Sequence, residues 1–311
     1  MEYRNLGKSG LRVSAIGLGT NQFGGKVDQQ TTADIVHAAV DAGINFIDTA
    51  DIYQDGRSEA YLGKALQGKR QDVILATKVF FPVSDRPNDR GASRQHILRG
   101  VENSLQRLGV ETIDLYQIHR WDDKTPIEET LRALDDLIRS GKVRYIGASN
   151  FSAWQLTHAN ALAELQGWSR FVSIQPHYNM LVRKVEEEML PACEYFGIGV
   201  LPYFPLAGGF LTGKYRAGEP IPEGSRGEQS EYVQDFMTEE NFQILSALID
   251  FAQSRGHSLT ELAHAWLLSR PQVSSVISGA TRVDQVLANA RSAGWELSPE
   301  EADRVDEILA G

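Results

Sequence analysis

Cysteine is nearly absent from this chain of 311 residues, which contains only Cys193. A single thiol cannot form an intrachain disulfide, so the sequence suits a reducing compartment. Long apolar runs are missing too, because stretches such as VILATKVFF are far too short to cross a bilayer. The first residues, MEYRNLGKSG, lack the apolar run behind a basic start that characterises a signal peptide. We therefore expect a cytoplasmic protein.

Positive charge is also scarce, since 31 Lys and Arg residues face 41 Asp and Glu residues and give a net charge of −10. An acidic surface argues against nucleic acid and anionic membranes as main partners. The 7 histidines are scattered, with no His-Glu-x-x-His pattern and no cysteine beside them. The sequence therefore predicts no metal site.

A two-part unit recurs along the chain, in which a short apolar run is followed by a longer pattern with helical periodicity. The helical patterns include 31–43, 92–109 and 126–141, and all three end at a glycine. Strands that alternate with helices in this way predict a (β/α)₈ barrel. The predicted strands are 14–20, 44–50, 72–78, 113–119, 143–149, 172–178, 198–204 and 273–279.

Two flanking segments complete the predicted fold. YRNL and LRVS around GKSG predict an N-terminal β-hairpin, and SPEEADRVDEILAG predicts a capped C-terminal helix. No linker or change of composition divides the chain, so we predict a single domain over residues 1–311. A doubly wound sheet is the alternative, but GLGTNQ has Gln22 where its third glycine should stand. The irregular stretch 207–238 is expected to be a long loop on the active-site face.

Polar residues stand where three successive predicted strands end. Asp48, Lys78 and His119 lie near the ends of the second, third and fourth strands, and Tyr53 lies in the loop that leaves the second. Neighbouring strands run about 4.8 Å apart, so these side chains are expected within reach of one another. The carboxyl ends of the strands form the catalytic face of a barrel. An isolated Asp–Lys pair is more often structural, but four such residues in this order favour a functional site.

The chemistry available to these residues is polarisation of a carbonyl group. Asp48 would keep Lys78 charged, and a charged Lys78 would lower the pKa of Tyr53 from its ordinary value of about 10. Tyr53 could then give a proton to an oxygen near neutral pH. His119 could donate a hydrogen bond to the same oxygen.

These residues also carry a resemblance to a known family. The pattern DTADIY…ATK…IH, with GKVRYIGASNF, IQPHYNML and LPYFPLAGGFLTGKY, is similar to that of the aldo-keto reductases. The resemblance covers essentially the whole chain and implies an NADPH-dependent carbonyl reductase on a (β/α)₈ barrel. It also implies that Tyr53 is the general acid, that Lys78 and Asp48 tune it, and that His119 orients the carbonyl group.

None of the four residues donates electrons, so a nicotinamide cofactor is expected. The resemblance places the carboxamide on Ser149, Asn150 and Gln175, and the ring on Tyr203. Residues 208–214 read G-x-x-x-x-G-K, but Tyr215 replaces the Ser or Thr of a P-loop. The resemblance assigns this segment to the pyrophosphate instead. The remaining predicted cofactor contacts are Thr20, Pro205, Leu206, Gly208, Leu211, Lys214, Arg226, Gly279, Thr281, Arg282, Gln285 and Asn289.

The segment after the last strand is expected to hold the 2′-phosphate and adenine. It departs from many relatives in lacking a basic residue near its start and in having Ala288 before Asn289. Arg282, Arg226 or Lys214 could supply the missing charge. NADPH is therefore predicted over NADH, with NADH left possible.

Phe80 and Trp121, with Phe81, are predicted to wall a pocket for a small carbonyl substrate. Two alternatives stay open. The loop DRGASRQHI resembles one in channel-associated members of the family, which implies a regulatory subunit with little turnover, although those members often lack the histidine. A lyase that uses Lys78 as a Schiff-base nucleophile is the other. The sequence leaves the substrate and the oligomeric state open.

Overall fold

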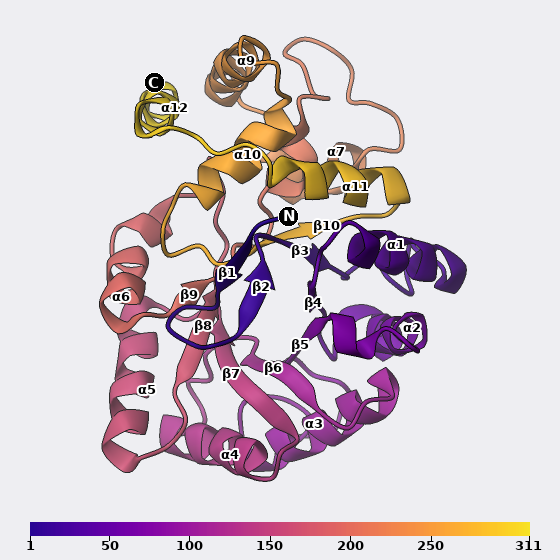
Figure 1. Cartoon of the computed structure of the whole chain (residues 1–311), viewed down its shortest axis with the longest axis vertical. Coiled ribbons are helices and arrows are strands. Elements are labelled where there is room, and N and C mark those ends of the chain that lie inside the picture. The colour runs from indigo at the N-terminus through magenta and orange to yellow at the C-terminus, as the bar shows by residue number, and fades with distance from the viewer.

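Eight parallel strands curl into a barrel in the computed structural model, which describes every residue from 1 to 311 (Figure 1). The strands run in the order β10-β3-β4-β5-β6-β7-β8-β9. Parallel bridges from Val200 to Val273 and from Tyr203 to Ile277 join the two edges. The predicted (β/α)₈ barrel is thus confirmed. The strands are β3 (Ile16–Gly19), β4 (Phe46–Asp48), β5 (Ile74–Val79), β6 (Ile113–Ile118), β7 (Val143–Ser149), β8 (Phe171–Gln175), β9 (Gly199–Val200) and β10 (Val276–Gly279).

Helices follow the strands and surround the barrel (Figure 1). Several begin with a side-chain cap, since Ser93 accepts a hydrogen bond from the His96 amide and Ser152 and Ser258 form capping boxes. Gly109 ends one helix in the left-handed conformation. The helices around the barrel are α1 (Gln29–Asp41), α2 (Arg57–Ala65), α3 (Arg94–Leu108), α4 (Ile127–Arg139), α5 (Ala153–Gln166), α6 (Met189–Phe196), α9 (Glu239–Gln253), α10 (Leu259–Leu268) and α11 (Val283–Ser292).

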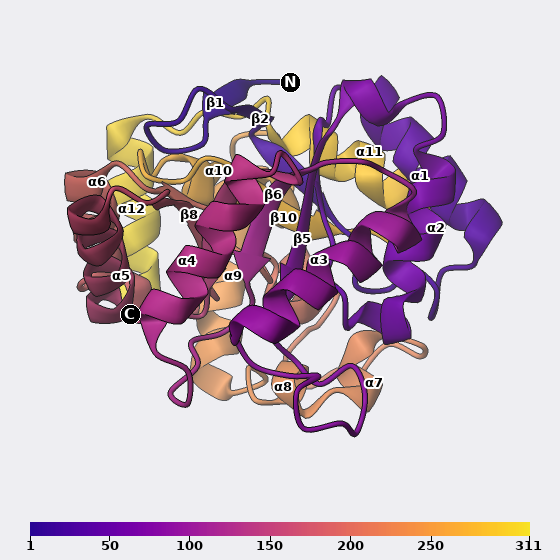
Figure 2. The same cartoon turned by 90° about the horizontal axis from the view of Figure 1, so that it is seen from below.

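The N-terminal hairpin closes one end of the barrel. Strands β1 (Tyr3–Asn5) and β2 (Arg12–Ser14) pair antiparallel. Leu6 and Val13 pack with strand residues such as Phe46 and Leu115 in a small buried cluster inside the barrel. Figure 2 shows the hairpin at one end of the molecule and the short helices α7 (Arg226–Gln229) and α8 (Glu231–Gln234) at the other. The site must therefore lie at the end that bears α7 and α8.

Three segments test the finer sequence expectations. Helix α12 (Pro299–Ala310) begins with a Ser298 capping box, as predicted for a capped terminal helix. The stretch 207–238 is not wholly irregular, because it contains a 3₁₀ segment (Ala207–Thr212) together with α7 and α8. No helix has both the length and the apolar composition needed to cross a bilayer. The assignment of residues 1–311 to a single domain stays a prediction.

Candidate active site

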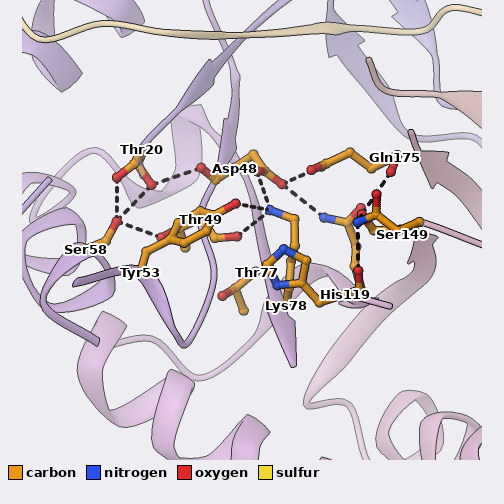
Figure 3. Close-up of polar contacts among 12 residues, drawn as sticks. Thr20, Asp48, Thr49, Tyr53, Ser58, Thr77, Lys78, His119, Ser149 and Gln175 are labelled. Atoms are coloured by element: carbon orange, nitrogen blue, oxygen red, sulfur yellow. Dashed lines mark hydrogen bonds and ion pairs between the residues drawn. The ribbon is translucent and has the colours of Figure 1, made fainter. Parts of the chain in front are cut away.

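Strands β4, β5 and β6 bring Asp48, Lys78 and His119 to the carboxyl end of the barrel. Lys78 lies at the centre of the group, with Nζ 2.5 Å from Asp48 Oδ2 and 3.5 Å from Tyr53 Oη (Figure 3). Lys78 Nζ also donates a hydrogen bond of 2.8 Å to the carbonyl oxygen of Thr49. The Lys78 and Asp48 side chains are buried, so the pair is shielded from solvent. The ammonium thus has a fixed position between a carboxylate and a phenol.

Tyr53 reaches this group because the chain turns sharply after β4. Its amide donates to the carbonyl oxygen of Ala50 at 3.1 Å, and the next two residues, Gln54 and Asp55, have φ values of 52° and 56°. Positive φ is uncommon outside glycine, so this turn is a specific feature of the loop. The Tyr53 ring lies 5.9 Å from the His119 ring in an edge-on arrangement. The structure therefore brings together all four residues predicted as catalytic.

Two side-chain amides hold the second oxygen of Asp48. Gln175 and Gln117 each donate from Nε2 to Asp48 Oδ1, at 2.9 and 3.1 Å. Gln117 was not predicted in this role from the sequence. The signal was present, since Gln117 precedes His119 by two residues on β6, and alternate residues of a strand face the same side. Its partner in the strand register is Lys78.

The pKa of Tyr53 differs from the expectation drawn from the sequence. Burial raises the pKa of Tyr53, and the opposing effect of the Lys78 ammonium is smaller. The prediction of a lowered tyrosine pKa was therefore wrong for this structure, because loss of hydration outweighs the nearby charge. Burial lowers the pKa of Lys78, but Asp48 and Tyr53 together more than reverse this, so its net pKa is raised. A charged Lys78 is a poor nucleophile, which argues against the Schiff-base alternative.

His119 is held in its neutral form. Burial, followed by the charges of Lys78 and Arg120, keeps its pKa well below the ordinary value. Its Nδ1 atom is buried without a hydrogen-bond partner. A neutral ring carries a single N–H, so His119 can donate one hydrogen bond to a ligand.

Asp51, the second acid of the loop, has a different environment. Its carboxyl group is buried and neither oxygen has a hydrogen-bond partner. Burial, followed by the negative charge of Glu59, raises the pKa of Asp51 to about 8. Glu59 itself is paired with Arg107 at 2.6 Å and accepts a hydrogen bond from Thr77. Asp51 is thus a neutral buried acid near neutral pH, and it lies outside the group around Lys78.

The residues predicted to hold the nicotinamide lie beside His119. Asn150 adopts a φ of 55° and donates from Nδ2 to the carbonyl oxygen of His119 at 3.0 Å. Tyr203 Oη donates to Asn150 Oδ1 at 2.9 Å, and Ser149 Oγ donates to the carbonyl oxygen of Gln175. Amide side chains offer both donors and acceptors, as a carboxamide requires. The group therefore fits the polar end of a nicotinamide.

The segment predicted for the pyrophosphate offers close backbone approach and one cation. Gly208 and Gly209 have φ values of 68° and 107°, a conformation that favours glycine. A Cβ atom on Gly209 would lie 3.3 Å from Lys214 Nζ, so the ammonium sits directly beside that backbone. The Leu211 side chain is fully buried, which leaves only its backbone for a ligand. Glycine backbone next to an ammonium suits a phosphate group. Pro205 and Leu206 precede this segment directly.

Several residues predicted to bind the adenine end of the cofactor already form hydrogen bonds or ion pairs within the protein. Gln285 Oε1 accepts from both the amide and the hydroxyl of Thr281, at 2.8 and 3.1 Å. Arg282 is exposed and pairs with Asp284 at 3.0 Å. These contacts lie at the start of α11, where unpaired backbone amides favour an anion. The other predicted residues here are Gly279, whose carbonyl oxygen Asn289 Nδ2 approaches at 3.4 Å, and Arg226 on α7.

Thr20 has a different location from the other predicted cofactor residues. Its side chain is fully buried, and its hydroxyl donates to the carbonyl oxygen of Asp48 at 3.0 Å. Thr20 Oγ1 also lies 3.0 Å from Ser58 Oγ. The hydroxyl thus supports the end of β4, and contact between Thr20 and a cofactor stays a prediction.

Aromatic side chains lie next to the His119 ring. Phe81 lies closest, with its ring 4.8 Å from the His119 ring, and Phe80 contacts Phe81 at 5.4 Å. Trp121 packs on Phe151 at 5.1 Å. Of the aromatic residues singled out in the sequence, Phe81 is therefore the one whose ring contacts His119, whereas Phe80 contacts Phe81.

Comparison with known proteins identifies this arrangement. A profile described as the Aldo/keto reductase family matches residues 15–310. The chain belongs to this family. As an aldo/keto reductase it is an oxidoreductase that acts on small molecules, and the family generally uses NAD(P)H.

Similar proteins cover the chain almost end to end. The aldo-keto reductase YhdN of Bacillus subtilis is 37% identical, over 99% of this chain and 94% of its own length. Versiconal hemiacetal acetate reductase of Aspergillus parasiticus is 35% identical, over 99% and 96%. A protein of Oryza sativa subsp. japonica described as a probable voltage-gated potassium channel subunit beta is 39% identical, over 99% and 97%. The relatives of this aldo/keto reductase therefore include proteins described as reductases and proteins described as probable channel subunits.

Proposed function

We propose that this aldo/keto reductase uses NADPH to reduce aldehydes or ketones, with Tyr53 as the general acid. The observation that carries the proposal is the position of Lys78 Nζ, which lies 2.5 Å from Asp48 Oδ2 and 3.5 Å from Tyr53 Oη. A single ammonium group thereby links a buried carboxylate to the phenol that would donate the proton.

Proton donation from Tyr53 leaves a phenolate next to the Lys78 ammonium. Opposite charges at this separation attract strongly in a buried site, so Lys78 stabilises the deprotonated tyrosine. Asp48 keeps Lys78 charged and oriented. The raised pKa of Tyr53 keeps the phenol protonated before the reaction, so the acid is available at neutral pH.

His119 orients the substrate in this proposal. Its ring lies 5.9 Å from the Tyr53 ring, and its lowered pKa keeps it neutral. A hydrogen bond from Nε2 to the carbonyl oxygen would place that oxygen near the Tyr53 hydroxyl. The two donors would then stabilise negative charge that develops on the oxygen.

The proposed cofactor is supported by residues that suit each part of a nicotinamide dinucleotide. A bound nicotinamide cofactor supplies the hydride. Ser149, Asn150 and Gln175 would hold the carboxamide, and Tyr203 would contact the ring. Residues 208–214 would hold the pyrophosphate. NADPH is proposed over NADH because Lys214, Arg226 and Arg282 provide cations along this path, as a 2′-phosphate requires.

The test is cofactor consumption by wild-type protein and by Tyr53→Phe. Loss of nicotinamide absorbance is followed with NADPH or NADH and para-nitrobenzaldehyde. We expect turnover with NADPH that the substitution nearly abolishes, while the Kd for NADPH is retained. Undiminished turnover by Tyr53→Phe would remove Tyr53 from its proposed role.

A second candidate is a regulatory subunit with little turnover. Similarity to two proteins described as probable voltage-gated potassium channel subunits beta, each 39% identical, favours it. The loop DRGASRQHI adds to this similarity. His119 favours the enzyme instead, because it supplies a hydrogen-bond donor at the carbonyl position. Tight NADPH binding without turnover on any aldehyde would make the regulatory function the better proposal.

A further inference from the structure

Arg120 is a cation at the edge of the site that the proposed mechanism does not use. It directly follows His119, and its side chain is exposed. Its guanidinium forms no ion pair with any carboxylate. Lys78, by contrast, is fully engaged by Asp48. Arg120 therefore has its charge available to a ligand.

The Arg120 side chain is directed along the site. Its Cζ atom lies 5.9 Å from the centre of the Phe81 ring, which is within the range of a cation–π contact. The same Phe81 ring lies 4.8 Å from the His119 ring, and His119 lies 5.9 Å from the ring of Tyr53. The Arg120 guanidinium, the Phe81 ring and the His119 ring thus form a continuous row of contacts that ends at Tyr53, the proposed proton donor.

Nearby acids do not neutralise this charge. Asp122 accepts hydrogen bonds from the Ala92 amide and the Thr125 hydroxyl, both at 2.8 Å. Asp51 is buried and forms no ion pair, and Asp123 forms none either. The positive charge also acts within the site, because Arg120 contributes, after burial and Lys78, to the lowered pKa of His119.

We propose that Arg120 determines specificity by binding the carboxylate of an aromatic aldehyde or ketone. The inference rests on the proposed function, since it assumes that the carbonyl group lies between Tyr53 and His119. From there a benzaldehyde ring would pass along Phe81 and present a para substituent to Arg120. A guanidinium binds a carboxylate through two parallel hydrogen bonds, which an ammonium cannot reproduce. The substrate class is therefore a planar carbonyl compound with an anionic group at its far end.

The experiment compares two substrates of similar shape that differ in charge. The ratio of kcat/KM for para-carboxybenzaldehyde to that for para-nitrobenzaldehyde is measured with NADPH for wild type, Arg120→Gln and Arg120→Lys. We expect Arg120→Gln to lower this ratio by about ten- to a hundredfold, mainly through KM, because hydrogen bonds between charged groups are lost. Arg120→Lys should give an intermediate ratio, since it keeps the charge but not the paired geometry.

Two controls separate this effect from other causes. Arg132→Gln removes one positive charge from the exposed face of α4, an element that carries none of the site residues, and should leave the ratio at its wild-type value. The Kd for NADPH is also measured for Arg120→Gln. If NADPH binding weakens by as large a factor as the kcat/KM ratio falls, Arg120 belongs to the cofactor site and the proposal is overturned. An unchanged ratio would overturn it as well.

Failure of the proposed function gives a different result. If neither aldehyde is turned over, the Kd for para-carboxybenzaldehyde is measured by calorimetry with wild type and Arg120→Gln, each saturated with NADP⁺. A Kd at least about tenfold weaker in the variant supports the anion site even without turnover. Equal Kd values overturn it.

Discussion

The side-chain amide of Gln117 donates a hydrogen bond of 3.1 Å to Oδ1 of Asp48, the carboxylate whose other oxygen holds Lys78. Gln175 donates to the same Oδ1 atom at 2.9 Å. The orientation of the Asp48–Lys78 pair therefore depends on two amides from strands β6 and β8. One of these strands also carries His119 at its end.

Replacing Gln117 with methionine should reduce turnover without removing substrate binding. The variant keeps the length of the side chain but removes a donor to a buried carboxylate, so Lys78 is held less firmly. We expect kcat to fall about tenfold, the effect of roughly 1.4 kcal/mol lost from one charged hydrogen bond. Gln106→Met, on the exposed face of α3, is the matched control. Wild-type kcat in Gln117→Met would show that Gln175 alone suffices.

Removal of Lys78 should separate catalysis from stability. Lys78→Met leaves Asp48 buried without its cation, so we expect a loss of about 3–5 kcal/mol in the free energy of unfolding and little remaining turnover. The double variant Asp48→Asn/Lys78→Met removes both charges and should regain much of that stability. Its activity should stay low, because Tyr53 still lacks the ammonium. Chemical denaturation and NADPH consumption provide the two measurements, and full activity in the double variant would contradict the mechanism.

The pH dependence of reduction should show no histidine titration. The pKa of His119 lies well below its ordinary value because of burial and the charges of Lys78 and Arg120. The pKa of Tyr53 is raised, chiefly by burial. We expect kcat/KM to be constant from weakly acidic to weakly alkaline pH and to fall only when Tyr53 loses its proton. An inflection near the ordinary histidine value of about 6.5 would mean that His119 is charged in the working enzyme.

Asp51 should make the fold less stable as the pH rises. Burial raises its folded-state pKa from 3.8 to about 8, so between these values the unfolded chain loses a proton that the folded protein keeps. Stability from this group is therefore lost progressively as the pH rises from about 4 and changes little above about 8. Asp51→Asn cannot ionise, so it should unfold at a higher temperature than wild type near pH 8, while the difference disappears near pH 4. Calorimetry from about pH 4 to about pH 8 measures the unfolding temperature of both proteins. If this temperature changes with pH equally in both, the prediction is excluded.

Gly63 should tolerate no side chain. A Cβ atom added there would lie 2.4 Å from the carbonyl oxygen of Leu108, where α2 packs against the end of α3. Gly63→Ala should cost about 1–3 kcal/mol through overpacking, despite the better helix propensity of alanine. Gly10→Ala is the control, since its Cβ would meet no atom within 4 Å. Urea denaturation of both variants checks the prediction, which a stabilised Gly63→Ala would contradict.

The barrel could be predicted from the sequence because apolar runs and helical periodicity repeat at regular intervals. Strand length was harder to predict, since the expected strand 198–204 is only Gly199–Val200 in the structure. Pro202 explains part of this difference, because proline has no amide hydrogen for the strand ladder. The grouping of Asp48, Tyr53, Lys78 and His119 could be predicted because strand ends converge in a barrel. Gln117 could not be predicted from strand ends alone, because it lies one residue before the end of β6 and faces inward. The pKa of Tyr53 could not be predicted, because the loss of hydration depends on how the loop after β4 folds.

The hairpin of residues 3–14 closes the end of the barrel opposite the active site. Leu6 and Val13 fill its base, and Gly7 lies so close to Gly197 and Gly199 that a Cβ atom there would come within 2.6 Å of their backbone. Ligands can thereby reach the reaction centre only from the opposite end of the barrel. A cofactor and a substrate that bind at this end would enter through the same opening, so the one that lies deeper would bind first and leave last.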